Sequence, residues 1–285
     1  AKGRGLPIWI TEVGFSCREG SSEWVRDSLA VPFFEWYRCG GGSSMFPRVA
    51  WYTTLGSPQG WTPTHLYEGN WTRRPLAYYY RLLGEIPPPP PTPAGPPVGD
   101  YVKLAPVADT SINAWYATRN YGLEGELTIR NPDIKASLLR FDVSTIPQNR
   151  ANSVTKARLL LYTTRAGLND VTVEAYRVLR RWSETKATWN IAFSGTSWRA
   201  AGCNGIGVDR RGTKESSFRL RPNGGPWYEM DLTAAVRYWV AHPDSNHGIV
   251  LKARGDRSGE YAFASTNHPD SCWRPRLEIW YDTSP

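Results

Sequence analysis

Glu12 is the residue best placed for chemistry in the first part of the chain. It follows residues 6–10, a short apolar run with the length and composition of a buried parallel strand. Sheets of such strands carry their reacting groups at the carboxyl ends of the strands. A carboxylate there can act as a nucleophile or as a general acid or base. The alternative for Glu12 is a buried acid held in an ion pair.

Two groups of rings and basic side chains in the second part of the chain suit the binding of an anionic sugar. Arginine can pair with a carboxylate through two hydrogen bonds, and an aromatic ring offers a face for stacking. The alternative is a solvated surface with incidental basic residues. The first group is Trp115, Tyr116 and Arg119, and the second flanks the turn at residues 255–259 and comprises Lys252, Arg254, Arg257 and Tyr261.

Neither group requires a cofactor. Asp109 is a candidate ligand for a structural Ca²⁺, because carboxylate oxygens are the ligands that this ion prefers. The four cysteines fall two and two on either side of a linker, which predicts the disulfides Cys17–Cys39 and Cys203–Cys272 and an oxidising compartment. The alternative is four buried free thiols.

The strongest boundary in the sequence is the linker at residues 85–99. Eight of the eleven residues from 87 to 97 are proline, which favours a semi-rigid polyproline II spacer. Before it, residues 1–84 predict the order strand, helix, strand, helix, with strands at 6–10 and 48–54. This order is typical of a parallel sheet.

After the linker the pattern changes to short strands separated by Gly, Asn, Asp and Pro. Such spacing is typical of an antiparallel sandwich or jelly roll. One helix, at residues 231–240, interrupts the series. The fold class is therefore mixed, with a partial parallel α/β segment followed by an all-β domain at residues 100–285. The predicted strands include 136–142, 157–162, 171–176, 248–253 and 276–281.

Composition narrows the classes of function. The chain carries a net charge of +8, with +6 in the part after residue 99, and its 14 Trp and 15 Tyr suit either sugar stacking or an aromatic β core. No helix-turn-helix, zinc-finger or RNP pattern supports nucleic-acid binding. No apolar run approaches the ~20 residues that a membrane span needs.

Residues 6 to about 83 resemble the last two β/α units of a clan A glycoside hydrolase, a retaining (β/α)8 barrel. The resemblance lies in Trp9-Ile-Thr-Glu-Val-Gly14 and Ala50-Trp-Tyr52. This resemblance implies that Glu12 is the nucleophile and that the Trp51 ring forms the floor of the sugar-binding subsite. In such barrels the acid/base follows an Asn, but this chain contains no Asn-Glu pair. We therefore expect the chain alone to be inactive as a glycosidase.

Residues 100–283 resemble a DNRLRE-type module, a β-sandwich appended to extracellular polysaccharide-degrading or surface proteins. The resemblance lies in Ala108-Asp-Thr-Ser-Ile112, Asn120-Tyr-Gly122, Leu138-Leu-Arg-Phe-Asp-Val-Ser144, Val154 to Tyr162, and above all Trp182-Ser-Glu-Thr-Lys-Ala-Thr-Trp-Asn190. It implies that Trp182, Glu184 and Trp189 belong to the framework.

Two hypotheses for function follow. The first is an extracellular or cell-surface carbohydrate-active protein, in which the sandwich holds an acidic polysaccharide beside a glycosidase barrel. The second is a non-catalytic surface or matrix protein that assembles through the sandwich. Both leave residues 1–84 in need of a partner, either the missing barrel segment or another chain, because a quarter of a barrel exposes sheet edges.

Overall fold

The computed structural model describes residues 10–13, 49–51 and 100–282. The chain divides into two compact units, residues 1–89 and 90–285. In the first unit, β1 (Ile10–Val13) pairs with β2 (Val49–Trp51) in parallel, the predicted direction of pairing, but β1 lies later in the chain than the strand predicted at residues 6–10. Glu12 lies inside β1, and Trp51 ends β2. The helices predicted for this unit lie outside the described residues, as do Cys17 and Cys39.

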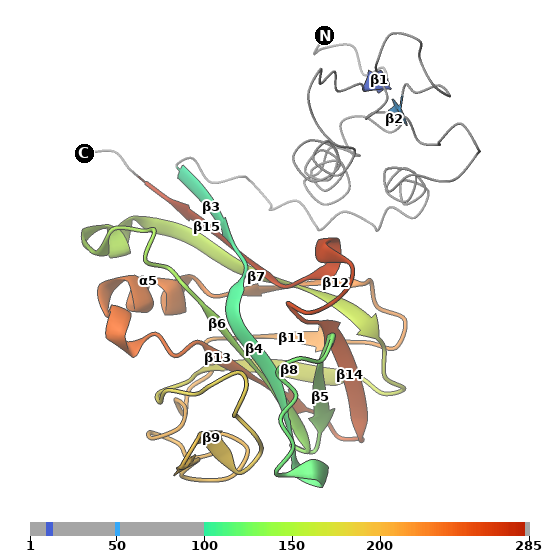
Figure 1. The fold of residues 1–285 in the computed structure, drawn as a ribbon, viewed down its shortest axis with the longest axis vertical. Coiled ribbons are helices and arrows are strands. Elements are labelled where there is room, and N and C mark those ends of the chain that lie inside the picture. The colour runs from blue at the N-terminus through green and yellow to red at the C-terminus, as the bar shows by residue number, and fades with distance from the viewer. Residues whose placement is uncertain (1–9, 14–48, 52–99, 283–285) are drawn as a thin grey trace, which may run out of the picture. The chain divides into compact units, whose positions relative to one another are not determined.

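The second unit is built from antiparallel strands, as the sequence predicts (Figure 1). Its helical elements are α5 (Thr233–Ala241) and the short 3₁₀ turns η4 (Ala114–Tyr116), η5 (Gln148–Ser153), η6 (Pro243–Ser245) and η7 (Ser271–Trp273). Its strands are β3 (Asp100–Leu104), β4 (Pro106–Asn113), β5 (Glu126–Asn131), β6 (Lys135–Phe141), β7 (Val154–Arg165), β8 (Val171–Arg177), β9 (Ile191–Phe193), β10 (Thr196–Ser197), β11 (Ser216–Leu220), β12 (Trp227–Asp231), β13 (Ile249–Arg254), β14 (Gly259–Ala264) and β15 (Arg276–Tyr281).

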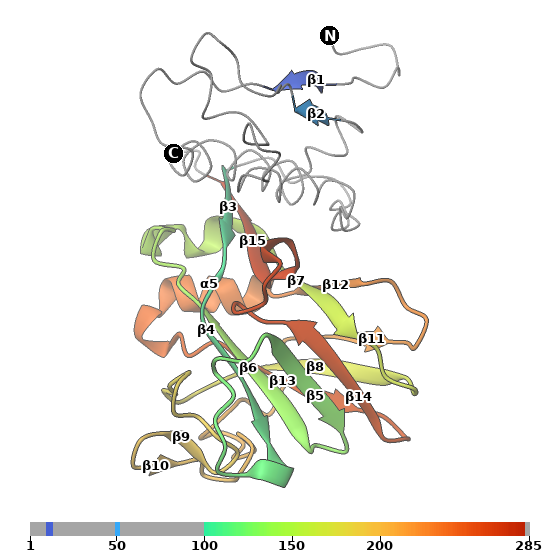
Figure 2. The same ribbon diagram turned by 45° about the vertical axis from the view of Figure 1, so that its right-hand side comes forward.

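One curled sheet holds most of these strands, in the order β11-β8-β13-β6-β5-β14-β7-β15-β3, with β4 added to β6 and β12 added to β7. A single residue pair, Arg130 opposite Lys135, joins β5 to β6. At that junction the sheet turns back on itself, so that β4, β6, β13, β8 and β11 form one layer and the remaining strands form the other (Figures 1 and 2). The result is the predicted β-sandwich.

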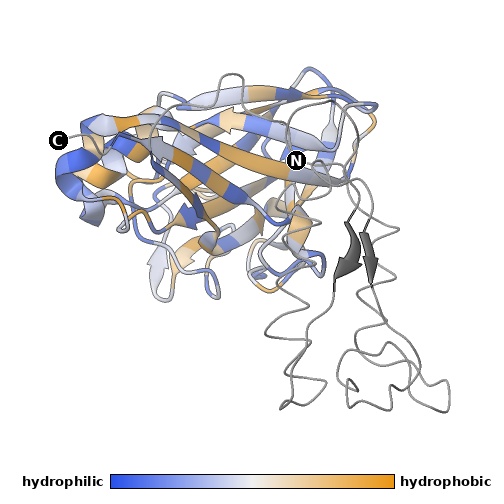
Figure 3. Cartoon of the chain, turned by 90° about the horizontal axis from the view of Figure 1, so that it is seen from above, coloured by the Kyte–Doolittle hydropathy of each residue, from blue (hydrophilic) through white to orange (hydrophobic). Residues whose placement is uncertain are grey.

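The main core lies between these two layers. Side chains from β6, β8 and β13 meet side chains from β5, β7, β14 and β15, and α5 closes one side through Val236 and Trp239. Edge strands such as β5 and β11 alternate between buried and more exposed positions, because one of their faces meets the core and the other meets water. Figure 3 shows this alternation as orange and blue bands along the strands.

A second core lies on the outer face of the first layer. There residues 178–203, which include β9 and β10, cover β6 and β13 through buried rings such as Trp182 and Trp198. Trp182 donates its indole N–H to the carbonyl of His247 at 2.8 Å, in keeping with the framework role that the resemblance implies. Because both faces of β13 are covered, its first five residues are all buried.

The predicted disulfide Cys203–Cys272 is wrong, because Cys203 carries a free, buried thiol. Cys203 belongs to the second core, on the outer face of the first layer. Cys272 lies in η7, which leads into β15 of the other layer. The division of the four cysteines into two pairs by the linker therefore does not predict which side chains meet.

Candidate functional site

Trp115 and Tyr116 lie in η4, directly after β4, and both rings face solvent. Asn113 ends β4 and caps η4, since its Oδ1 accepts a hydrogen bond from the backbone N–H of Trp115 at 3.0 Å. Trp115 is 56% exposed and Tyr116 is 61% exposed. This exposure next to a strand end is compatible with the predicted role in stacking on a ligand, which stays a prediction.

Arg130 and Lys135 complete this surface, and the sequence analysis missed both. The guanidinium carbon of Arg130 lies 4.7 Å from the centre of the Trp115 ring, and the Lys135 ammonium lies 5.6 Å from it. The two residues oppose each other across the β5–β6 turn. The Asn131-Pro132-Asp133 sequence between two strands was the available signal, because such a turn pairs the residues that flank it.

Glu260 of β14 holds these cations in place. Its carboxylate lies 3.2 Å from Arg130, 2.9 Å from Lys135 and 3.1 Å from Arg165. Burial raises the pKa of Glu260, but hydrogen bonds from Lys135 and Arg165 outweigh it, so the pKa lies below its ordinary value. Three cations around one carboxylate leave this surface with a positive charge.

Arg119 lies beside the same surface but is turned toward its own loop. It donates to Glu124 at 2.8 Å and covers the ring of Tyr121. The next residue, Asn120, donates its amide N–H groups to the carbonyls of Glu184 and Ala187 at 2.7 and 2.8 Å, and so anchors the loop to the segment that covers the first layer. We refer to Trp115, Tyr116, Arg119, Arg130 and Lys135 as the tryptophan patch.

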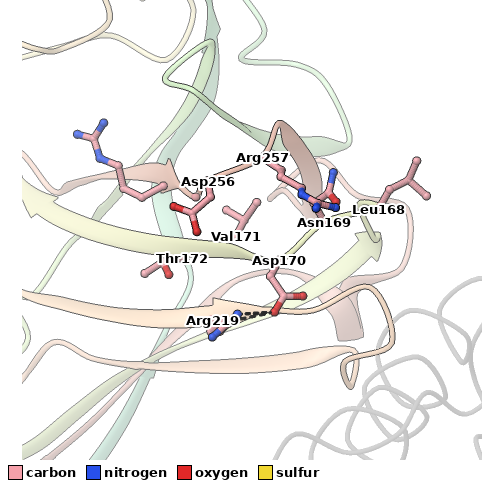
Figure 4. A pocket seen from close by; sticks show the side chains of 10 residues that line it. Leu168, Asn169, Asp170, Val171, Thr172, Arg219, Asp256 and Arg257 are labelled. Atoms are coloured by element: carbon pink, nitrogen blue, oxygen red, sulfur yellow. Dashed lines mark hydrogen bonds and ion pairs between the residues drawn. The ribbon is translucent and has the colours of Figure 1, made fainter.

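Arg254 and Arg257 line an open pocket of about 650 Å³ (Figure 4). The pocket lies between the β7–β8 loop, the β13–β14 turn and the end of β11, which adds Arg219. Arg219 contacts Asp170 at 2.7 Å. The structure thus brings these two predicted arginines together, but separately from Trp115.

Lys252 and Tyr261 were predicted to bind ligand, and both predictions are wrong. Lys252 is fully buried beneath the segment that covers the first layer; its ammonium donates to Asp133 at 2.9 Å and to the carbonyl of Gly202. Burial lowers its pKa, against the opposing charge of Asp133. Tyr261 belongs to the main core, and its hydroxyl donates to the carbonyl of Asn169 at 3.0 Å.

Asp109 is also buried, and both of its carboxylate oxygens are occupied. They accept hydrogen bonds from Thr266, one from the backbone N–H at 2.8 Å and one from the hydroxyl at 2.9 Å. Burial, and then the nearby charge of Glu184, raise the pKa of Asp109 to about 6. Within residues 10–13, 49–51 and 100–282, no three His, Cys, Asp or Glu side chains gather where they could hold a metal ion, and a Ca²⁺ at Asp109 stays a prediction.

The part of the chain that the structure describes has no helix long and apolar enough to cross a membrane. No curated protein matches the chain in sequence. A family profile does match: carbohydrate-binding module family 96, over residues 100–281, which includes the tryptophan patch and the arginine-lined pocket. The match covers the whole sandwich and identifies it as a carbohydrate-binding module. The chain therefore belongs to carbohydrate-binding module family 96.

Proposed function

We propose that the module binds an acidic polysaccharide through the tryptophan patch. The observation that carries this proposal is the half-exposed ring of Trp115 with two cations, Arg130 and Lys135, over it. A ring face suits the apolar face of a pyranose, and the cations suit a carboxylate or sulfate on the same sugar.

The two cations supply the preference for an anionic ligand. Glu260 offsets part of their charge, but Arg165 also contacts that carboxylate, so the surface keeps a positive charge. Because Arg130 and Lys135 are held by Glu260, they lose little side-chain freedom when a ligand binds. Exposed charge pairs contribute little each, so we expect micromolar or weaker affinity that falls as salt rises past ~0.15 M.

We further propose that the module acts outside the cell, beside a glycosidase barrel of which residues 1–84 are the end. The family assignment supports carbohydrate binding, and the parallel pair β1–β2 is compatible with a barrel segment. Glu12 would then be the nucleophile, with Trp51 in the sugar subsite. The acid/base would come from a segment upstream of residue 1.

The test is a titration of the whole chain with a polyuronate and with a neutral glucan, at low and at high salt. We expect stronger binding to the polyuronate and a loss of that preference at high salt. Trp115→Ala should weaken binding by about five- to tenfold, from about 1 kcal/mol of lost ring contact. Tyr101→Ala, a half-exposed ring on β3 outside the patch, is the matched control and should bind like the parent. Equal weak binding to both polymers, or none, would favour the second hypothesis, a structural surface protein.

A further inference from the structure

The arginine-lined pocket has a net positive charge. Three guanidinium groups reach it from different elements: Arg219 from β11, Arg254 from the end of β13 and Arg257 from the β13–β14 turn. Two carboxylates, Asp170 and Asp256, also line it. A site with more cations than anions favours an anionic ligand over a metal ion.

The ion pairs of Arg219 and Arg254 with nearby carboxylates neutralise only part of this positive charge. One oxygen of Asp170 accepts from both Nε and Nη2 of Arg219, at 2.9 and 2.7 Å. Arg254 lies 3.5 Å from Glu174, but that carboxylate already accepts hydrogen bonds from Lys214 and Tyr176. Arg254 therefore shares its acidic neighbour with other donors, and its guanidinium stays half-exposed and open to a ligand anion.

The β7–β8 loop that forms one wall is fixed in place. The side chain of Asn169 donates to the carbonyl of Ser258 at 2.8 Å, and its backbone carbonyl accepts from the buried hydroxyl of Tyr261 at 3.0 Å. Gly167 in the same loop lies so close to β14 that a Cβ would come within 2.5 Å of the carbonyl oxygen of Glu260. Walls held in this way need little ordering when a ligand binds.

Asn131 fixes the opposite wall and joins the pocket to the tryptophan patch. Its side-chain amide donates to the carbonyls of Gly255 and Arg257, at 2.7 and 2.9 Å. The residue before it is Arg130, which lies over Trp115. The pocket and the patch are thus neighbours at one end of the sandwich.

The pocket also offers apolar contact. Leu168 on its rim is 92% exposed, and Val171 on its floor belongs to the main core. A leucine so exposed beside three arginines suits a ligand with both an apolar face and an anionic group, as a pyranose that carries a carboxylate or sulfate has.

Resting on the proposed function, we infer that the arginine-lined pocket is a second subsite for the same acidic polysaccharide. One polymer chain lies across the end of the sandwich, from Trp115 past Asn131 to Arg219. Short oligomers fill only the tryptophan patch. Affinity then rises with oligomer length until both sites are filled, because the second contact forms within one complex.

The test uses the whole chain and a series of oligouronates of increasing length, measured by calorimetry at low salt. The double variant Arg254→Gln/Arg257→Gln should bind the shortest oligomers like the parent, but should lose about tenfold in affinity for the longest. Arg181→Gln/Arg199→Gln removes two exposed arginines outside the pocket and controls for the same loss of charge. Asn131→Ala should also reduce the increase in affinity with oligomer length, although this variant keeps every arginine of the pocket.

The outcomes separate the two proposals. If the parent chain binds no oligouronate, the proposed function fails. If the parent binds but the double variant keeps the full gain in affinity with length, the pocket is not a subsite and the proposed function stands. If Arg181→Gln/Arg199→Gln lowers long-oligomer affinity as much as the pocket double variant does, net charge explains the effect and the pocket proposal is overturned. Circular dichroism of each variant establishes that the fold is intact.

Discussion

Asp109 makes the stability of the module depend on pH, in a direction that the structure fixes. Its carboxylate is buried, and its pKa is raised to about 6 from an ordinary value of 3.8, first by burial and then by the charge of Glu184. A carboxylic acid with a raised pKa in the folded state stabilises the fold while it is protonated. That contribution is complete below about pH 3.8 and is lost as the pH rises through about 6.

The size of the effect follows from the shift. A difference of about 2 pKa units corresponds to about 3 kcal/mol of unfolding free energy, at ~1.4 kcal/mol per unit. Asp109→Asn removes the charge but keeps the hydrogen bonds, because an amide can accept from the N–H of Thr266 and donate to its hydroxyl. We therefore expect the variant to match the parent near pH 4 and to be more stable by up to about 3 kcal/mol at pH 7.

Scanning calorimetry of the whole chain between pH 4 and pH 7.5 measures the unfolding free energy of the variant and of the parent. Subtracting the parent value from the variant value at each pH cancels the contributions of the other titrating groups. Asp142→Asn is the control, since Asp142 is exposed and its pKa is lowered by hydrogen bonds from Ser144, so no gain at pH 7 is expected. A variant-minus-parent difference that stays constant across the pH range would refute the assignment of a raised pKa to Asp109.

Three further predictions follow. Lys252→Met should lower the unfolding free energy by about 2–3 kcal/mol in urea titrations, because it leaves Asp133 without its buried cation; an unchanged midpoint would contradict this. The Cys203 thiol, whose pKa burial raises to about 12, should not react with a thiol reagent at pH 8 until the chain unfolds, and rapid reaction of the native protein would show that it is accessible. The chain alone should not hydrolyse an activated aryl glycoside; turnover that Glu12→Gln abolishes would mean that an acid/base is present after all.

Local pattern predicted the strands of the second unit well. The strand predicted at residues 276–281 has the bounds of β15, Arg276–Tyr281, and the helix predicted at 231–240 becomes α5, Thr233–Ala241. In both cases apolar residues recur with the period of the element, so a single segment contains the information. Trp115 and Tyr116 were predicted as ligand contacts from their place in a loop, and they are exposed as that role needs.

The error at Lys252 came from packing that no single segment reveals. Lys252 follows the inward-facing Leu251, so alternation places it on the outer face of β13, where a lysine ordinarily meets water. That face is covered by residues distant in the sequence, which bury the lysine. The burial of Tyr261, in contrast, could have been predicted from its own segment. Tyr261 and Phe263 occupy alternate positions along β14 and so share the inward face of the strand.

The pairing of β3 with β15 determines how the module responds to a pulling force. Asp100, where the linker joins, lies opposite Tyr281 at the end of this antiparallel pair, and η4 lies at the other end of the sandwich (Figures 1 and 2). Tension between a bound polymer and the linker would pull along β3, across the direction of its hydrogen bonds to β15, and would load those bonds together in shear. Because several bonds must then break at once, β3 should stay paired with β15 under tension and carry the force from the linker into the sandwich.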